Sequence, residues 1–396
     1  MPSNAKLVLA LCCCAASPAC GSDPALTDTD SSSSSTATGS SGGDSSGVVN
    51  PAATTDPTTD PTTTTGVADS GTSGSGGSSG GTYGVPAPVS FDLGTVPDAP
   101  IVADPIPDFD CDDVPDEFVS FQVIPGARGY HGIEITPDGR AIGSDGNSLI
   151  DATYEGDWSL FIPGIGSGQQ MDWLPNGDLA HATDDGAITR IGLAGTTEVI
   201  RSGVGAYGVV VGPDEQIYVT MGNSGNRVDR IDPASGDLET VVTSPGPTLH
   251  STGFSPDGTR MYVGTISGGG IVYYVDFDAA MNPLSGLQVF TTGATSGGSN
   301  WHDAIAVDAC GYIYVTDYSS RNMFRVSPGG EAILFWDPAD QGHYAHGLVW
   351  GTGEHGWIED ALYFPQPYNT NTVGEVVVGV PPAGFGGTVL NAPEML

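Results

Sequence analysis

Basic residues are scarce in this chain. It has 10 Lys plus Arg against 47 Asp plus Glu, and its one lysine is Lys6. Nucleic acids and anionic membrane surfaces are bound through clustered cations, so the sequence predicts neither as a direct partner. Because Lys6 lies in the N-terminal segment that we expect to be removed, Schiff-base and lysine general-base mechanisms are excluded as well.

Cysteine is also scarce outside the N-terminus. Of the six cysteines, only Cys111 and Cys310 lie beyond residue 20. In an oxidising compartment, two remaining cysteines favour one disulfide, which would attach the segment before the first strand to a late part of the fold. The alternative is two unpaired thiols.

The N-terminus has the pattern of an export signal. Lys6 is followed by the apolar run LVLALCCCAA and the small residues SPAC, and this run is too short to span a bilayer. Cys20 resembles the acylated cysteine of a bacterial lipobox, although Ser17 stands where leucine is usual. We therefore expect 1–20 to be a signal peptide with a lipobox. The protein would then reside in the cell envelope and touch the membrane only through a lipid anchor; plain secretion is the alternative.

Three further segments follow this signal. Residues 21–83 are rich in Ser, Thr, Gly, Asp and Pro, and bury too little apolar surface to offset the entropy of ordering, so we expect a disordered linker. Residues 84–117 are rich in Pro and Asp and read as an extended segment. Residues 118–396 are long enough for one large all-β domain, which we expect to be monomeric.

An internal repeat dominates this folded part. Each unit of about 40 residues has a polar first residue, alternating apolar residues, a turn such as PDG, PNG or DACG, and three further strand-like runs. The six units begin at His131, Gln169, Tyr207, His250, Asp303 and His346.

Four strands per unit are typical of a propeller blade, so the repeat predicts an all-β fold, a six-bladed β-propeller. The last unit ends at GEVVVGV and lacks a complete fourth strand, whereas the strand-like segment Phe118–Ile124 precedes the first unit without a blade of its own. We expect Phe118–Ile124 to complete the last blade and close the ring.

Two stretches carry a family resemblance. WHDAIAVDACGYIYVTDYSSRNMFRVSPGG (301–330) and HSTGFSPDGTRMYVG (250–264) resemble the NHL-repeat and SMP-30/gluconolactonase-like propellers. In the lactonase branch a Glu, an Asn and an Asp bind a central divalent metal, and the resemblance implies Asp303 for the Asp. His250 stands at the Asn position and His131 where the Glu is expected, so two of the three ligands differ.

The first residues of the six units should meet near the axis of the ring. Three of them are histidines and one is an aspartate, so we predict a metal site formed by His131, His250, Asp303 and His346. Imidazoles with one carboxylate favour Zn, Fe or Mn over Ca. Gln169 would line the channel. The alternative is a polar channel filled with ordered water, in which these side chains bond to backbone groups.

Two classes of function remain open from the sequence. The first is a metal-dependent hydrolase of lactonase type, or a lyase, with Tyr207 or His302 as the group that transfers protons. A six-bladed lyase family that cleaves peptidyl-hydroxyglycine is similar in using three histidines on zinc with a nearby tyrosine, but its arginine has no counterpart in this ring. The second is a non-catalytic surface module that binds a small molecule, sugar, peptide or protein.

Overall fold

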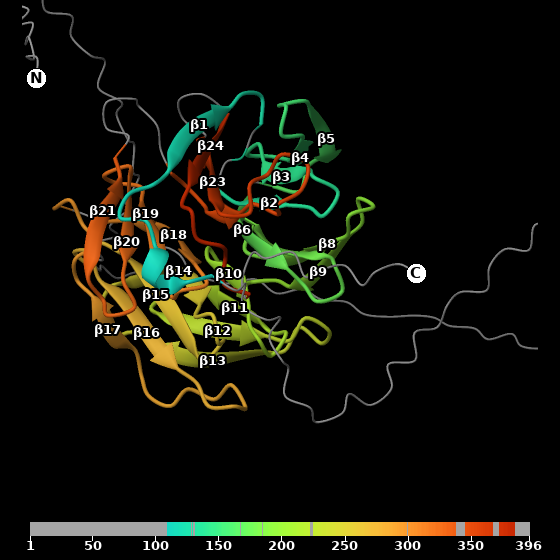
Figure 1. Ribbon diagram of the computed structural model, residues 1–396. Helices are drawn as coiled ribbons and strands as arrows, with labels where there is room; N and C mark the ends of the chain where they lie inside the picture. The colour runs from blue at the N-terminus through green and yellow to red at the C-terminus, as the bar shows by residue number, and fades with distance from the viewer. Residues whose placement is uncertain are drawn as a thin grey trace, which may run out of the picture. The chain divides into compact units, whose positions relative to one another are not determined.

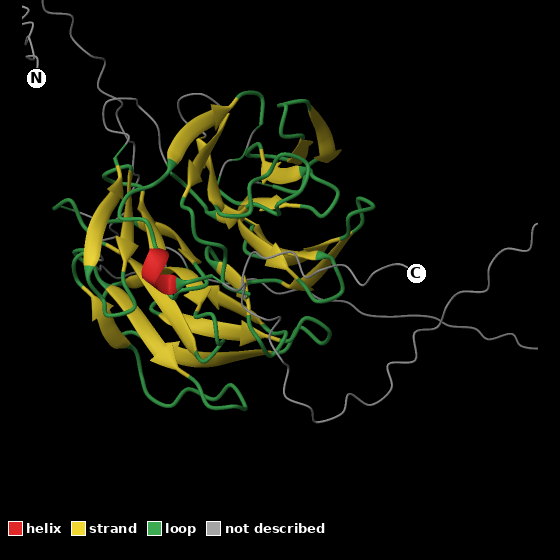
Figure 2. Cartoon of the chain, viewed as in Figure 1, coloured by secondary structure: helices red, strands yellow, loops and turns green. Residues whose placement is uncertain are grey.

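The computed structural model describes residues 109–127, 129, 131–166, 168–183, 185–221, 225–298, 300–337, 345–366 and 372–384. The expected signal peptide, its Cys20 and the linker 21–83 lie outside these residues, as does 84–117 except for its last nine positions. The described part consists of strands joined by turns and loops (Figure 2), with one short 3-10 helix, η1 (Cys111–Asp113). Within these ranges no helix has the length and apolar character needed to cross a bilayer.

The strands form six antiparallel sheets of four strands, the blades of a propeller (Figure 1). Blade 1 contains β2 (Ile133–Ile135), β3 (Ala141–Ser144), β4 (Leu149–Ala152) and β5 (Trp158–Ile162), and blade 2 contains β6 (Gly168–Trp173), β7 (Leu179–Thr183), β8 (Ile188–Ile191) and β9 (Thr197–Arg201). Blade 3 contains β10 (Val209–Val211), β11 (Ile217–Thr220), β12 (Arg227–Ile231) and β13 (Leu238–Thr243), and blade 4 contains β14 (Thr248–Phe254), β15 (Arg260–Ile266), β16 (Val272–Asp276) and β17 (Gln288–Thr291). Blade 5 contains β18 (His302–Val307), β19 (Ile313–Asp317), β20 (Asn322–Val326) and β21 (Ala332–Trp336), and blade 6 contains β22 (Val349–Trp350), β23 (Ala361–Gln366), β24 (Thr372–Val377) and β1 (Ser120–Ile124). The predicted fold is thereby confirmed.

The ring closes through β1, which pairs antiparallel with β24 from Ser120 opposite Val377 to Ile124 opposite Val373. The β1 side chain Gln122 donates a hydrogen bond of 2.6 Å to the buried Glu375 of β24. The strand from the start of the folded part thus completes the last blade, as the sequence predicts. Closure leaves each sheet with only short edges, which limits pairing with other chains.

Apolar side chains between neighbouring blades form the core. Between blades 3 and 4, for example, Tyr218, Phe254 and Phe277 pack edge to face or tilted, with ring centroids 5.2 to 6.1 Å apart. These positions come from the period-two alternation of the inner strands, which buries one face of each sheet against the next blade. The blades therefore hold their inner strands in a fixed arrangement around the axis.

The turn between the first two strands of each blade explains the repeated PDG motif. Gly139 ends this turn in blade 1 with φ +81°, a conformation that glycine adopts without steric cost. In blade 3 the same position holds Glu215, which also adopts a positive φ, of 62°. The turn geometry therefore persists where the glycine is lost, which is why the third unit still folds as a blade.

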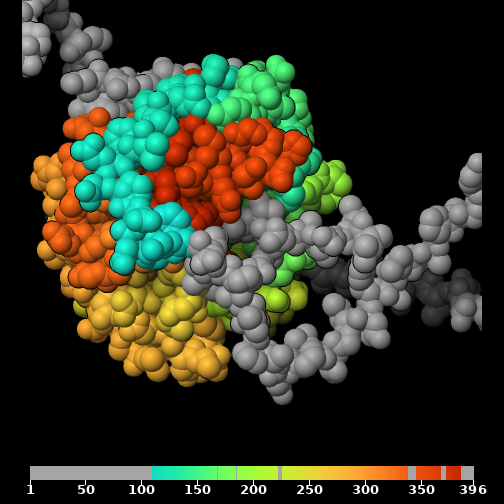
Figure 3. All heavy atoms as spheres, in the orientation of Figure 1, coloured from blue at the N-terminus to red at the C-terminus, as the bar shows by residue number. Residues whose placement is uncertain are grey.

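A disulfide joins Cys111 to Cys310, with Cα atoms 5.6 Å apart. Cys310 follows β18, so the bond attaches the segment before β1 to blade 5. The Arg325 guanidinium of the same blade donates hydrogen bonds to the carbonyl oxygens of Pro115 and Asp116. Figure 3 shows this N-terminal segment, in cyan, lying across the orange and red blades of the C-terminal half.

Candidate functional site

The innermost strands of the six blades surround a narrow channel. Residues of β2, β6, β10, β14, β18 and β22 line one cavity of about 50 Å³ along the axis. The six polar residues that begin the repeats lie at or just before these strands, as the repeat predicts. Their side chains, however, are not equivalent in the structure, and they fall into two groups.

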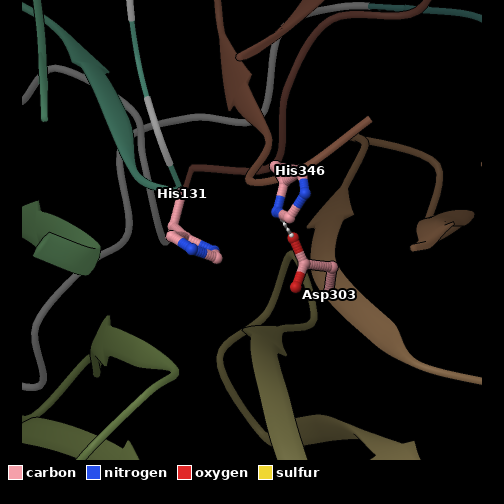
Figure 4. A group of neighbouring side chains, drawn as sticks. All are labelled: His131, Asp303 and His346. Carbon is pink, nitrogen blue, oxygen red and sulfur yellow. Dashed lines mark ion pairs between the residues drawn. The ribbon is translucent and has the colours of Figure 1, made fainter. Parts of the chain in front are cut away.

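The first group contains His131, Asp303 and His346, from blades 1, 5 and 6 (Figure 4). One potential ligand atom from each lies within 4.8 Å of the other two. His346 and Asp303 are 2% and 1% exposed, and His346 Nδ1 lies 2.7 Å from Asp303 Oδ2. At that distance Nδ1 carries the proton, since a second lone pair would be repelled by the carboxylate.

Tyr207 connects the two sides of this group. Its hydroxyl donates a hydrogen bond of 2.7 Å to Asp303 Oδ1, and the same oxygen lies 2.7 Å from His131 Nδ1. Because the hydroxyl proton is engaged with the carboxylate, His131 Nδ1–H donates to the hydroxyl oxygen. His131, Tyr207, Asp303 and His346 therefore form one chain of polar contacts at the channel, and we call them the acidic group.

The charge of the acidic group resides on Asp303. Burial by itself would raise the pKa of this carboxyl, but His346, which is in contact with it, and the nearby His250 and His131 hold the pKa below its usual range. Asp303 is therefore an ionised carboxylate almost fully removed from water. Two imidazoles and one ionised carboxylate that converge in a buried site suit a transition-metal ion, so the residues present fit such a metal.

The second group contains His250, which is fully buried in β14. Its Nδ1 lies 3.0 Å from the carbonyl oxygen of His302, and its Nε2 accepts a hydrogen bond of 2.9 Å from the Trp301 indole N–H. A carbonyl only accepts and an indole only donates, so His250 is neutral with its proton on Nδ1. Burial lowers the pKa of His250 to about 3, in agreement with a neutral ring. Both ring nitrogens are engaged, and the structure does not bring His250 into the three-residue metal group.

His302 points away from the acidic group. Its Nε2 lies 2.9 Å from the carbonyl oxygen of Ala294, and its Nδ1 accepts a hydrogen bond of 3.4 Å from the backbone N–H of Thr265. Burial lowers its pKa as well. Its neighbour Asp303 points to the axis because successive strand residues face opposite sides. Of the two predicted proton-transfer residues, the structure therefore brings only Tyr207 to the acidic group.

In blade 2 the channel cavity is lined by Gln170, the residue after the predicted Gln169. Gln170 is the second residue of its repeat, as Gly132 and Gly347 are in blades 1 and 6, and these two also line the cavity. Gln170 donates a hydrogen bond of 2.5 Å to the backbone carbonyl of Asp303. It thereby holds the backbone that carries the central carboxylate.

Sequence reasoning missed Glu134 and Asp172, two acidic residues deeper in the channel. Each stands three positions after the first residue of its repeat, on β2 and β6, and both are buried. Burial raises the pKa of Glu134 well above its ordinary value, and the charge of Asp172 adds to this effect. The sequence contains a signal for them: in HGIEI and QQMDW an acidic residue stands between two apolar strand residues.

Comparison with known proteins supports the fold and one family region. A family model described as "SMP-30/Gluconolactonase/LRE-like region" matches residues 249–338, a segment that contains both His250 and Asp303. No curated protein matches the chain.

Solved structures extend the similarity to the whole propeller. A calcium-binding protein, regucalcin, from Agrobacterium tumefaciens is 16% identical with a TM-score of 0.54, covering 71% of this chain and 98% of its own. A gluconolactonase from Xanthomonas campestris is 14% identical with a TM-score of 0.53, covering 66% and 89%. A luciferin-regenerating enzyme is 13% identical with a TM-score of 0.53, covering 68% and 99%. At these identities the similarity shows the fold. The chain is thus a six-bladed propeller with an SMP-30/gluconolactonase/LRE-like region, and its structural neighbours are gluconolactonase- and regucalcin-like propellers.

Proposed function

We propose that this protein is an exported, lipid-anchored hydrolase of lactonase type that depends on a transition-metal ion held by His131, Asp303 and His346. One observation carries the proposal: these three side chains converge from three blades to within 4.8 Å, around an ionised carboxylate that is 1% exposed. The family region and the gluconolactonase among the structural neighbours support the reaction class.

The residues of the acidic group have distinct parts in this proposal. The imidazole nitrogens and the Asp303 carboxylate would hold the ion, which supplies an acidified water and polarises an ester carbonyl when it is bound. His346 Nδ1 and Asp303 Oδ2 lie 2.7 Å apart with a proton between them, so metal binding displaces a proton or rotates the ring to present Nε2. The donor set favours Zn, Fe or Mn over Ca.

Tyr207 is the proton-transfer residue of this proposal. Its hydroxyl oxygen contacts both His131 and Asp303 at 2.7 Å, so it is within hydrogen-bond reach of any group bound between them. It would donate a proton to the alkoxide that leaves when a lactone ring opens, while Gln170 keeps the backbone of Asp303 in place.

Hydrolysis of lactones and esters tests this function. Purified protein is assayed against a panel of both, as isolated, after chelation, and after Zn²⁺, Fe²⁺ or Mn²⁺ is returned. We expect hydrolysis that chelation removes and one of the metals restores, and a large loss in Tyr207→Phe with the metal content unchanged. Activity that chelation leaves intact would exclude the metal-dependent reaction.

The proposed localisation has its own test. Cys20→Ala should move the protein from the membrane fraction to the soluble exported fraction, since a lipid anchor is the proposed attachment. A variant that stays in the membrane fraction argues against lipidation at Cys20. The same soluble variant provides protein to check that the propeller is a monomer.

A second candidate is a surface module that binds a ligand without turning it over. Tyr207 already joins His131 to Asp303 through two hydrogen bonds, so these two residues are linked without an ion. An auxiliary nutrient binding protein from Bacteroides thetaiotaomicron also shares the fold, with 11% identity, a TM-score of 0.51 and coverage of 63% of this chain and 69% of its own. A purified protein with no stoichiometric transition metal and no hydrolysis would favour this second function.

A further inference from the structure

The channel cavity is also lined by polar residues that lie outside the acidic group. Glu134 of β2 and Asp172 of β6 lie on neighbouring inner strands and are 3% and 4% exposed. Thr252 of β14, 5% exposed, lines the same cavity. We call Glu134, Asp172 and Thr252 the channel-floor group. None of the three belongs to the acidic group.

The polar atoms of the channel-floor group are unequally satisfied. Asp172 accepts hydrogen bonds from the backbone N–H groups of Trp173, at 2.8 Å, and Val211, at 2.6 Å. In contrast, Glu134 Oε2 and Thr252 Oγ1 have no hydrogen-bond partner among the described residues, although both atoms are fully shielded from solvent. A buried carboxylate oxygen without a partner is costly, and native proteins rarely leave one unsatisfied.

The space beside these atoms matches a small ligand. The cavity holds about 50 Å³, which is room for an ion with a few water molecules and too little for an organic substrate. Small residues keep it open, because Gly253 and Ala306 also line its wall. The inner strands are the edges of their sheets, so backbone carbonyl groups also face this space.

The chemistry of these donors is uniform. All are oxygens: two carboxylates, one hydroxyl and the carbonyl groups of the strand edges. A hard divalent cation takes such a set, whereas zinc and other transition metals prefer nitrogen or sulfur. A water molecule would satisfy the unpartnered atoms and leave Glu134 protonated, since its pKa is raised, whereas a bound cation lets both carboxyl groups be ionised.

We propose that Glu134, Asp172 and Thr252 bind a hard divalent cation of the Ca²⁺ class in the middle of the channel, at a site separate from the acidic group. The cation links the inner strands of blades 1, 2 and 4, so it stabilises the ring at its axis. This proposal does not depend on the proposed hydrolase activity.

A calcium titration of the whole purified protein tests the site. After chelation, Ca²⁺ alone is added and followed by calorimetry and by the melting temperature. We expect one Ca²⁺ per chain and a melting temperature raised by several degrees. Glu134→Gln keeps the shape of the side chain and removes its charge, and should weaken Ca²⁺ binding by at least about tenfold. Glu354→Gln, at an exposed loop position, is the matched control and should bind like the wild type.

Two further comparisons separate this site from its alternatives. His131→Ala should leave Ca²⁺ binding unchanged, because His131 belongs to the acidic group, so loss of Ca²⁺ binding in that variant would overturn a separate site. The proposal would also be overturned if Ca²⁺ did not change the melting temperature of the wild-type protein, or if Glu134→Gln bound Ca²⁺ as tightly as the wild type. In either case Glu134 and Asp172 would be a carboxyl pair that shares a proton.

Discussion

Histidines lie on both sides of the channel mouth, but their hydrogen-bonding environments differ. On the side of blades 1, 5 and 6, His131 and His346 converge with Tyr207 on the carboxylate of Asp303. On the side of blade 4, His250 lies against the Tyr207 ring, with centroids 3.5 Å apart, yet gives both of its nitrogens to Trp301 and to the His302 carbonyl. The position of a histidine in the repeat places it near the axis of the ring. Its hydrogen-bond partners then determine whether one of its ring nitrogens can bind a ligand.

The most disruptive test of this contrast is Asp303→Asn. The substitution keeps the size of the side chain and removes the charge on which His346 and Tyr207 converge. We expect stoichiometric metal to be lost and hydrolysis to fall by more than about 100-fold. Elemental analysis and the lactone assay measure both, and an active variant that retains its metal would refute the central role of Asp303.

A pair of histidine variants compares the two sides directly. His131→Ala removes a member of the acidic group and should weaken metal binding by at least about tenfold. His250→Asn removes a ring that has both nitrogens engaged and should change metal affinity less than about threefold, while lowering the melting temperature. Equal loss of metal in both variants would mean that the two sides act as one site.

Acid should destabilise the fold because His250 of blade 4 and His302 of blade 5 are buried with their pKa values lowered. The folded-state pKa of His250 is lowered to about 3 by burial, so between about pH 6.5 and pH 3 the unfolded chain binds one more proton than the native one. Stability is therefore present above pH 6.5 and falls by about 1.4 kcal/mol for each pH unit below it. His302, whose pKa is also lowered, acts in the same direction.

Chemical denaturation of chelated protein from pH 7 to pH 4 measures this slope. His250→Asn should make it shallower, and the difference between the two proteins isolates His250. Asp308, whose pKa burial raises to about 6, acts in the opposite direction below pH 6 but is the same in both proteins and cancels. Parallel pH curves for the two proteins would show that His250 is not held neutral.

The smallest expected effect comes from Trp301→Phe. This variant keeps an aromatic ring and removes the indole N–H that His250 Nε2 accepts. We expect the free energy of unfolding to fall by about 1 kcal/mol and the metal content to stay at the wild-type value. Denaturation and elemental analysis report the two quantities. A fall in metal content would assign Trp301 to the acidic group instead.

The sequence was sufficient to predict the propeller and the closure of its ring. The turns and the period-two strands recur in every unit, so the blade architecture and closure by β1 follow from local patterns. The engagement of His250 did not follow, because one of its partners is a backbone carbonyl and the other an indole beyond a long connection, at the start of the next blade. The sequence repeat predicts which residues occupy equivalent positions in the blades. It does not predict the hydrogen bonds that their side chains make with neighbouring blades.

Two further features of the channel were not predicted from the sequence. Gln170 was not predicted because the second residue of the repeat also faces the cavity, as Gly132 and Gly347 do, and in those two units it has no side chain. Glu134 and Asp172 were not predicted because the repeat aligns polar side chains only at the first residue of each unit, and these two stand three positions later. An acidic residue within an apolar strand is itself a signal of a buried polar site.

The disulfide has a mechanical consequence for the closure of the ring. Cys111 precedes β1, and its bond to Cys310 lies in blade 5. Tension applied upstream of Cys111 therefore enters the ring through a covalent bond, before it can load the hydrogen bonds between β1 and β24. Strand β1, which closes the ring, is therefore shielded from a force applied upstream of Cys111, and the hydrogen bonds of blade 6 should outlast those of a variant without the disulfide.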